Sequence, residues 1–246
     1  MIVLLIDAGN SRVKWALVEG DVWLRQGTLE NAQVETLRKT FSELPPPDKI
    51  LVSNVAGERM MQQLRAACAA WPCPIGFILA RVEQCGVRNK YEHAAQLGSD
   101  RWAALIAARH QARTACLVVD CGTATTVDAL SANGEFLGGL ILPGIDMMRH
   151  SLAAGSAQLA ENTGDWHEFP RNTADAVFSG AIQATVGAIR LQFEALAIHG
   201  EARCLLSGGA ADYVQPHLKL PLMREENLVL RGLQIISLTE QESGAL

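Results

Sequence analysis

The chain lacks the features that mark several broad classes of protein. Of its 246 residues, 49% are hydrophobic and only 19% are charged, which excludes a disordered chain. Its 21 glycines and 9 prolines follow no triplet pattern, which excludes a collagen. No apolar run reaches the ~18 residues that a membrane span needs. The short apolar run at residues 2–6 has no basic segment before it and stops at Asp7, so we expect no signal peptide.

Signals for nucleic-acid binding and for zinc are missing as well. The net charge is −5 and no run of five basic residues occurs, so we expect no nucleic-acid partner. The 6 histidines show no close ligand spacing and the 6 cysteines form no CxxC pair, so a structural zinc site is not expected. Without an export signal, these cysteines are predicted to be reduced, buried thiols of a cytoplasmic protein.

Three familiar motifs are absent: there is no GxxxxGK[ST] loop, no GxGxxG after a strand and no GxSxG turn. The chain has instead a regular alternation of apolar strands and amphipathic helices. In the first half we predict strands at 2–6, 13–17, 50–52 and 75–79, and helices at 34–44, 60–71 and 102–109. In the second half we predict strands at 116–119, 127–130, 136–141 and 204–206, helices at 145–154, at 173–199 and around 233–236, and a loop at 155–172.

Both halves of the chain open with a strand, an Asp-x-Gly turn and a second strand. The first strand leads to Asp7 and Gly9, and the strand at 116–119 leads to Asp120 and Gly122. We interpret this pattern as an internal duplication. It divides the chain into two α/β domains, at residues 1–114 and 115–246.

The turn at residues 7–11, with Lys14 after it, has the composition of a phosphate-binding loop. Its glycine lets the backbone approach an anion closely, and consecutive N–H groups then bind the phosphate. Lys14 supplies positive charge, and Asp7 can hold a metal-bound water. Asp, Gly and Asn are also common in ordinary β-turns, so this turn alone leaves both interpretations open.

The second turn, at residues 120–123, favours phosphate binding. Two strand-ending Asp-x-Gly turns, each followed by a hydroxyl residue, suggest two phosphate loops that face each other across a cleft. A third segment, residues 207–210, follows a buried strand and contains Gly208 and Gly209, whose bare backbone can lie against a nucleotide base. An ordinary strand-to-helix turn also explains this third segment.

In this order the three segments resemble those of the actin–hexokinase–Hsp70 ATPase superfamily. Its members hold a nucleotide in a cleft between two duplicated actin/ribonuclease H-like α/β domains. Within it, the chain resembles the type III pantothenate kinases from residue 3 to about residue 233. The motifs that carry this resemblance are Asp7-x-Gly9-Asn10-Ser11-x-x-Lys14, Asn89-x-Tyr91, Leu97-Gly98-Ser99-Asp100-Arg101, Asp120-x-Gly122-Thr123-Ala124-Thr125-Thr126, Gly138-Gly139 to Pro143-Gly144, and Asn172-Thr173.

The resemblance implies roles for individual residues. Asp100 would be the general base on the pantothenate hydroxyl, and Asp120 would coordinate a monovalent cation, K⁺ or NH₄⁺. The ATP-binding residues would be Asp7, Ala8, Gly9, Asn10, Ser11, Arg12, Val13, Lys14 and Thr123. The pantothenate-binding residues would be Tyr91, Gly98, Ser99, Asp100, Arg101 and Thr173. Mg²⁺ would accompany ATP, the adenosine region would lie in the second domain, and the protein would form a homodimer.

The residues themselves give a partial argument for Asp100 and Arg101. They precede an amphipathic helix, where an aspartate is often only a cap and an arginine is often a surface ion partner. A kinase, however, needs a base that accepts the hydroxyl proton, and a planar guanidinium suits the carboxylate of pantothenate. Each of the two residues therefore has two interpretations.

We expect ATP-dependent phosphorylation of pantothenate to 4′-phosphopantothenate, the first step of coenzyme A biosynthesis. Two alternatives use the same fold. One is a nucleotide-binding accessory regulator of transcription, and the other is a kinase for another small hydroxy acid. Asp100 disfavours a pure regulator, and Tyr91 together with Arg101 favours pantothenate as the substrate.

Overall fold

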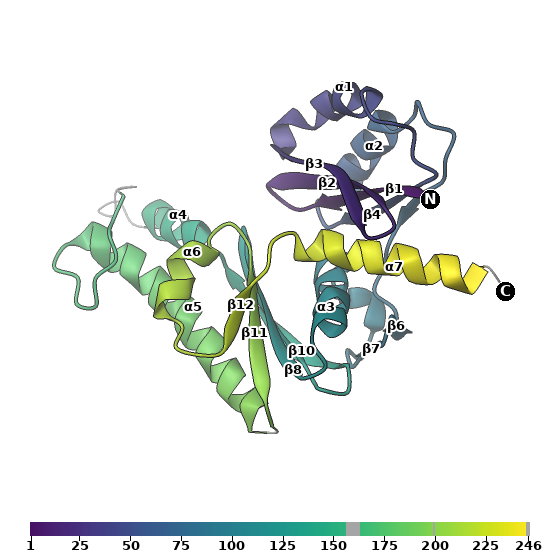
Figure 1. Cartoon of the computed structure of the whole chain (residues 1–246). Helices are drawn as coiled ribbons and strands as arrows, with labels where there is room; N and C mark the ends of the chain where they lie inside the picture. The colour runs from purple at the N-terminus through teal and green to yellow at the C-terminus, as the bar shows by residue number, and fades with distance from the viewer. Residues whose placement is uncertain (156–162, 199, 245–246) are drawn as a thin grey trace. The chain divides into compact units, whose positions relative to one another are not determined.

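The computed structural model describes residues 1–155, 163–198 and 200–244, and the chain folds into two compact units (Figure 1). The first unit consists of Met1–Gln111 together with Asn227–Leu246, and the second of Ala112–Glu226. Each unit has its own hydrophobic core. In the described part of the chain, no helix combines the length and the apolar character needed to cross a membrane.

Five strands form the sheet of the first unit. They are β1 (Ile2–Ala8), β2 (Arg12–Glu19), β3 (Val22–Glu30), β4 (Lys49–Asn54) and β5 (Ile75–Phe77). Their order is β3-β2-β1-β4-β5, and the first three pair antiparallel, whereas β4 and β5 continue parallel to β1. The central position of β1 explains its continuous apolar run, because such a strand is buried on both faces.

Helices cover both faces of this sheet. One face carries η1 (Asn31–Thr36), α1 (Leu37–Ser42) and α2 (Glu58–Ala67), which share a core with alternate residues of β1. The opposite face carries α3 (Ser99–Gln111) and α7 (Leu228–Gly244), which pack on each other and on β1 and β4 (Figure 1). A short hairpin, β6 (Glu83–Gln84) with β7 (Val87–Asn89), and η2 (Ala94–Gln96) lead into α3.

The second unit repeats this sheet. Its strands are β8 (Ala115–Cys121), β9 (Ala124–Leu130), β10 (Glu135–Pro143), β11 (Ala202–Ser207) and β12 (Leu222–Arg224). They lie in the order β12-β11-β8-β9-β10, with β8, β9 and β10 antiparallel and β11 and β12 parallel to β8. Strand for strand, this is the arrangement of the first unit. The topology therefore confirms the predicted duplication.

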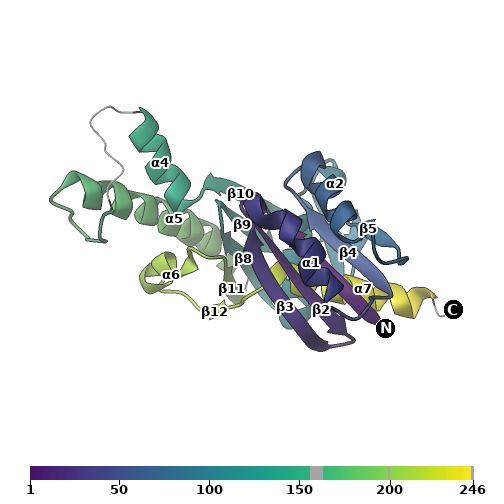
Figure 2. The same ribbon diagram turned by 90° about the horizontal axis from the view of Figure 1, so that it is seen from above.

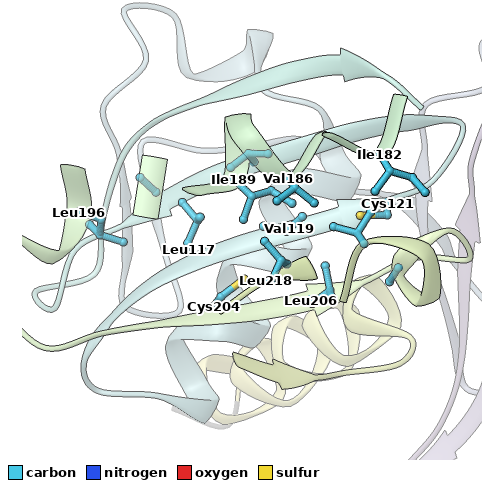
Figure 3. Close-up of a cluster of buried hydrophobic side chains, with 14 of the residues drawn as sticks. Leu117, Val119, Cys121, Ile182, Val186, Ile189, Leu196, Cys204, Leu206 and Leu218 are labelled. Atoms are coloured by element: carbon cyan, nitrogen blue, oxygen red, sulfur yellow. The ribbon is translucent and has the colours of Figure 1, made fainter. Parts of the chain in front are cut away.

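The core of the second unit lies between its sheet and one long helix. The helices are α4 (Ile145–Gly155), α5 (Thr173–Ala197) and α6 (Ala211–Val214), followed by η3 (Gln215–His217). Apolar side chains of α5, among them Ile182 and Ile189, face Leu117 and Val119 of β8 (Figure 3). Helices α4 and α5 pack together at one end of this unit (Figure 2).

The C-terminal helix departs from the division that the sequence suggested. We expected residues 115–246 to form one domain, but α7 packs with the first unit. Its contact with α3 depends on Gly232, because a Cβ there would lie 1.9 Å from the carbonyl oxygen of Ala103. Chain order is a poor guide to the place of such a helix, since what fixes it is the face onto which it packs.

Several elements differ from the prediction. The strands β3, β6, β7 and β12 were not predicted, because β3 is largely exposed and the other three have only 2 or 3 residues. The predicted helix at 34–44 divides into η1 and α1, and α2 ends at Ala67, short of the prediction. The long helix ends at Ala197, and part of the predicted loop at 155–172, like residue 199, lies outside the described residues.

The cysteines follow the prediction only in part. All 6 are free thiols, but only Cys68, Cys116, Cys121 and Cys204 are buried, whereas the other two are half-buried. Burial raises the pKa of Cys68, Cys116 and Cys121 to about 12. These thiols therefore stay protonated at neutral pH and pack as small apolar groups.

Candidate active site

The end of β1 places three polar side chains on one face of the first sheet. Asp7 is the next-to-last residue of this strand, and its register neighbours are Lys14 of β2 and Ser53 of β4. Directly opposed residues of neighbouring strands project to the same face. A carboxylate, an ammonium and a hydroxyl group thus share the strand ends where we predicted the first phosphate loop.

The turn after β1 is held from outside. The N–H of Gly9 donates to the carbonyl of Arg12 at 3.0 Å, which closes the turn. The side chain of Asn31 donates from Nδ2 to the carbonyls of Gly9 and Asn10, both at 2.9 Å. Asn31 was not among the predicted site residues. Its only signal in the sequence is an asparagine at the end of a strand that was itself not predicted.

The start of α3 lies beside this turn. The hydroxyls of Ser53 and Ser99 are hydrogen-bonded at 2.9 Å, and both side chains are buried. The N–H of Val55 donates to the carbonyl of Ala8 at 3.0 Å, which ties the chain after β4 to the end of β1. The structure therefore brings the first predicted phosphate loop and the predicted segment at 98–101 to the same end of one unit.

Asp100 occupies the first turn of α3, where its Oδ1 accepts a hydrogen bond from the N–H of Arg101 at 2.7 Å. Gly98 leaves room for this position of the carboxylate, because a Cβ there would lie 2.5 Å from that oxygen. Burial raises the pKa of Asp100, although the N–H and the guanidinium of Arg101 partly oppose the shift. The carboxylate is thus both part of a helix start and a half-buried group with a raised pKa.

Arg101 is not a surface ion partner. It is only 6% exposed, and its Nη1 donates to the Tyr91 hydroxyl at 3.1 Å. Tyr91 is held in turn by Asn89, whose Oδ1 accepts from the Tyr91 N–H at 3.0 Å and whose Nδ2 donates to the carbonyl of Ala94 at 3.2 Å. The two predicted pantothenate residues therefore form one pair beside Asp100.

The second unit builds a related strand end. Asp120 of β8 has Thr126 of β9 and Ser207 of β11 as register neighbours. In the following turn, the N–H of Gly122 donates to the carbonyl of Ala124 at 3.0 Å, and the carbonyl of Thr123 accepts from Gly144 at 3.0 Å. The predicted cation residue and the predicted ATP residue of this unit are therefore adjacent, in surroundings rich in oxygen atoms.

The segment after β11 packs tightly on the end of β8. Gly208 has a φ of +96°, and a Cβ there would lie 2.4 Å from the backbone of Cys121. The Nη2 of Arg224 donates to the carbonyl of Gly208 at 2.9 Å, while its buried Nη1 has no partner among the described residues. Sequence analysis did not identify Arg224, because it ends a strand of only 3 residues that was not predicted.

Thr173, the remaining predicted site residue, begins α5. The side chain of Asn172 caps this helix and accepts from the N–H of Asp175 at 2.9 Å. Thr173 lines a cavity of about 910 Å³ between α4 and α5, which Pro143 at the end of β10 also lines. Because Pro143 pairs with Ala124, this cavity begins next to the turn that holds Thr123.

The comparison with protein families decides the classification. The model of the family "Type III pantothenate kinase" matches residues 3–195 of this chain. A type III pantothenate kinase of Aromatoleum aromaticum is 47% identical, over 96% of this chain and 97% of its own length. That of Nitrosospira multiformis is 44% identical, over 99% of this chain and 94% of its own length. The chain belongs to the type III pantothenate kinase family.

Solved structures confirm the predicted fold class. A Campylobacter jejuni protein, provisionally described as a Baf family transcriptional activator, is 24% identical with a TM-score of 0.64, over 99% of this chain and all of its own. The activator of 2-hydroxyisocaproyl-CoA dehydratase from Clostridium difficile has a TM-score of 0.55 at 11% identity, over 100% of this chain and 98% of its own. At these identities the likeness shows the two-domain actin-like ATPase fold and not a function.

Membership of this family supports the expected activity, which is phosphorylation of pantothenate in coenzyme A biosynthesis. A kinase of this family uses ATP with a divalent metal ion. A transcriptional role, which we kept as an alternative, appears in the description of one structural relative, the Campylobacter jejuni protein at 24% identity.

Proposed function

We propose that this chain transfers the γ-phosphoryl group of ATP to the hydroxyl of pantothenate with Asp100 as the general base. The observation that carries the proposal is the hydrogen-bonded pair of the buried Arg101 and the half-buried Tyr91 beside the Asp100 carboxylate, at the same end of the first unit as the turn after β1. This reaction needs a residue that binds the carboxylate of pantothenate, a general base and a phosphate-binding loop.

Asp100 would accept the hydroxyl proton as the oxygen attacks phosphorus. Phosphoryl transfer asks the protein mainly for positioning and for charge stabilisation, and a base that orients the hydroxyl in line with the phosphate serves both. A carboxylate whose pKa is raised by burial holds a proton better than an exposed one. Mg²⁺ would reach the site with ATP and offset the charge of its phosphates.

Arg101 would bind the carboxylate of pantothenate. Its planar guanidinium makes charge-assisted contacts with a carboxylate, and these are strong where water is excluded. The Tyr91 hydroxyl holds Nη1, so the guanidinium is oriented before substrate arrives. Gly98 and Ser99 would line the same pocket, and Thr173 would contribute from the second unit.

ATP would bind through residues 7–14 of the first unit and Thr123 of the second. Lys14 supplies the positive charge at the first turn, and the exposed backbone of Asn10 and Ser11 supplies N–H donors. The glycines at 208 and 209 leave bare backbone for the nucleoside.

A monovalent cation, K⁺ or NH₄⁺, would lie at Asp120. The donor set fits such an ion, because Asp120, Thr126 and Ser207 offer oxygen atoms on one face of the sheet. Neither of these two neighbours carries a charge, so the carboxylate would be the anionic ligand. The ion would add positive charge where the transferring phosphoryl group is most negative.

We further propose a cytoplasmic homodimer without a nucleic-acid or membrane partner. The second unit has exposed apolar side chains suited to a subunit interface. They are Leu137, Leu140 and Ile141 of β10, Met147 and Leu152 of α4, and Leu191 of α5.

One assay tests the proposed function. The purified chain is incubated with pantothenate, ATP and Mg²⁺, with and without K⁺, and formation of ADP and 4′-phosphopantothenate is followed. We expect turnover that depends on both substrates and increases with K⁺. Absence of phosphopantothenate under all these conditions would contradict the proposal.

A further inference from the structure

The turn that follows β1 depends on one residue outside it. Asn31, the first residue of η1, contacts three successive carbonyl groups. Its Nδ2 donates to the carbonyls of Gly9 and Asn10, each at 2.9 Å, and its backbone N–H donates to that of Ser11 at 3.0 Å.

This arrangement fixes the direction of the N–H groups. In a trans peptide the carbonyl and the N–H point in opposite directions, and the described chain has no cis peptide bond. Because the carbonyls of residues 9–11 point at Asn31, the N–H groups of Asn10, Ser11 and Arg12 point away from it. All three residues are exposed, so this part of the turn lies at the surface, where a ligand can reach it. Successive N–H groups on one side form an anion-binding concavity.

A purely local role for the Asn31 side chain does not explain its position. Asparagine at a helix start commonly caps the helix, but the N-cap of η1 is Glu30 and no side chain caps it. The Oδ1 of Asn31 is buried and accepts no hydrogen bond from the described residues. An unsatisfied buried oxygen lowers the stability of the fold. The side chain therefore donates to the two carbonyls in an arrangement that is unfavourable for its own oxygen.

We propose that Asn31 is a positioning residue for ATP, which orients the N–H groups of Asn10 and Ser11 toward its phosphates. The inference rests on the proposed function, in which this turn binds the phosphates of ATP. Asn31 touches neither the substrate nor the reacting atoms. It acts through the backbone, by removing the carbonyl dipoles from the phosphate side and holding the donors in place.

The test compares Asn31→Ala and Asn31→Asp with Thr36→Ala. Asp keeps the shape of the side chain, but its oxygens cannot donate to the carbonyls. Thr36→Ala is the matched control, since it removes one side chain–backbone hydrogen bond from the same short helix, to Gln33, without touching the turn. The readouts are the KM values for ATP and pantothenate, the melting temperature, and the calorimetric Kd of a non-hydrolysable ATP analogue.

We expect both Asn31 variants to raise the Kd of the analogue and the KM for ATP about tenfold, as the loss of oriented hydrogen bonds implies. The Asp variant should show the larger effect, the KM for pantothenate should change little, and the melting temperature should resemble that of Thr36→Ala. Equal increases in both KM values would indicate general damage and overturn the proposal.

Lys14→Ala separates this proposal from the function on which it rests. If Lys14→Ala weakens binding of the analogue and Asn31→Ala does not, the role of Asn31 is wrong and the ATP assignment of the turn stands. If neither variant weakens binding, the turn does not hold the phosphates, and both assignments are overturned.

Discussion

The two units share one sheet topology but differ in a charge at the end of the central strand. In the first unit Asp7 lies between Lys14 and Ser53. In the second, Asp120 lies between Thr126 and Ser207. The serine is repeated, whereas the residue on the hairpin side is a lysine in one unit and a threonine in the other. The two strand ends are thus equivalent in position and differ by a lysine in the first unit and a threonine in the second. In the proposed function, this difference would suit the first to phosphate and the second to a cation.

The units also differ in what covers the strand that carries the serine. In the first unit Ser53 is hydrogen-bonded to Ser99, which fixes the start of α3 at the strand end. This helix start carries Asp100 and Arg101. In the second unit the chain after Ser207 passes through Gly208, which lies directly on the backbone of Cys121. Beside this serine, the first unit therefore places the charged residues Asp100 and Arg101, whereas the second places backbone.

The sharpest test of this difference is Asp100→Asn, which keeps the shape of the first-unit site and removes the proton acceptor. We expect kcat to fall by about 10²–10⁴-fold with a modest change in KM, because positioned bases contribute that much. The matched control is Asp146→Asn, which changes an aspartate in the first turn of a second-unit helix, where it is exposed and paired with Arg149. A near-normal kcat for Asp100→Asn in steady-state assays would rule out Asp100 as the base.

The second test concerns Arg101. Leaving one charge of a buried pair without its partner costs on the order of 2–5 kcal/mol. The wild type should therefore discriminate strongly, by kcat/KM, between pantothenate and its uncharged alcohol analogue. Arg101→Ala should lose most of this discrimination, and Arg101→Lys should recover only part of it, because an ammonium makes no planar two-point contact.

The control for Arg101 is Arg65→Ala. Arg65 also lies against an aromatic ring in the first unit, with its Cζ 4.9 Å from the centre of Phe77, but it belongs to α2 and not to the site. Its loss should leave the preference for the acid intact. Equal kcat/KM values of the wild type for pantothenate and for its alcohol analogue would exclude Arg101 as the residue that binds the carboxylate.

The third test exchanges the charge that distinguishes the units. Asp120→Ala should abolish the response to K⁺ or NH₄⁺ without unfolding the protein, because a neutral alanine cannot hold the ion. Thr126→Lys gives the second unit the arrangement of Asp7 and Lys14, so its ammonium should replace the ion and make activity independent of K⁺. Thr126→Val removes the hydroxyl without adding charge and serves as control. Wild-type activity that does not vary with K⁺ or NH₄⁺ would refute the cation assignment.

The sequence predicted the parts of the molecule that local chemistry determines. The Asp-x-Gly turns and the repeated strands were recognisable because strand-ending Asp and Gly leave a pattern along the chain. The closeness of Ser53 to Ser99 was not, since the partners are 46 residues apart and only the packing of α3 on β4 brings them together. Two other features depend on long-range contacts of the same kind. They are the hydrogen bonds from Asn31 to the carbonyls of Gly9 and Asn10, and the packing of α7 with the first unit.

The smallest expected effect is on stability. Replacing one aspartate in each unit should shift the melting temperature in opposite directions. Burial raises the pKa of Asp100 in α3, so the native state holds the proton more strongly than the unfolded chain. Its ionisation therefore destabilises the fold, and this penalty is complete once the pH exceeds the raised native pKa. Asp100→Asn should raise the melting temperature at neutral pH, and the difference should vanish as the pH falls and the carboxyl takes up its proton.

Asp175 in α5 gives the opposite case. Its pKa is lowered by the N–H of Asp165, by the Asn172 side chain and by the charge of His167. Its ionised form therefore stabilises the fold above the unfolded pKa, and this contribution is lost as the pH falls through the lowered native pKa. Asp175→Asn should lower the melting temperature at neutral pH and approach the wild type in acid. Melting curves of both variants and the wild type across this range check the two signs together. If Asp100→Asn were destabilising at neutral pH, the carboxylate of Asp100 would be a structural cap and not a group held at a cost for catalysis.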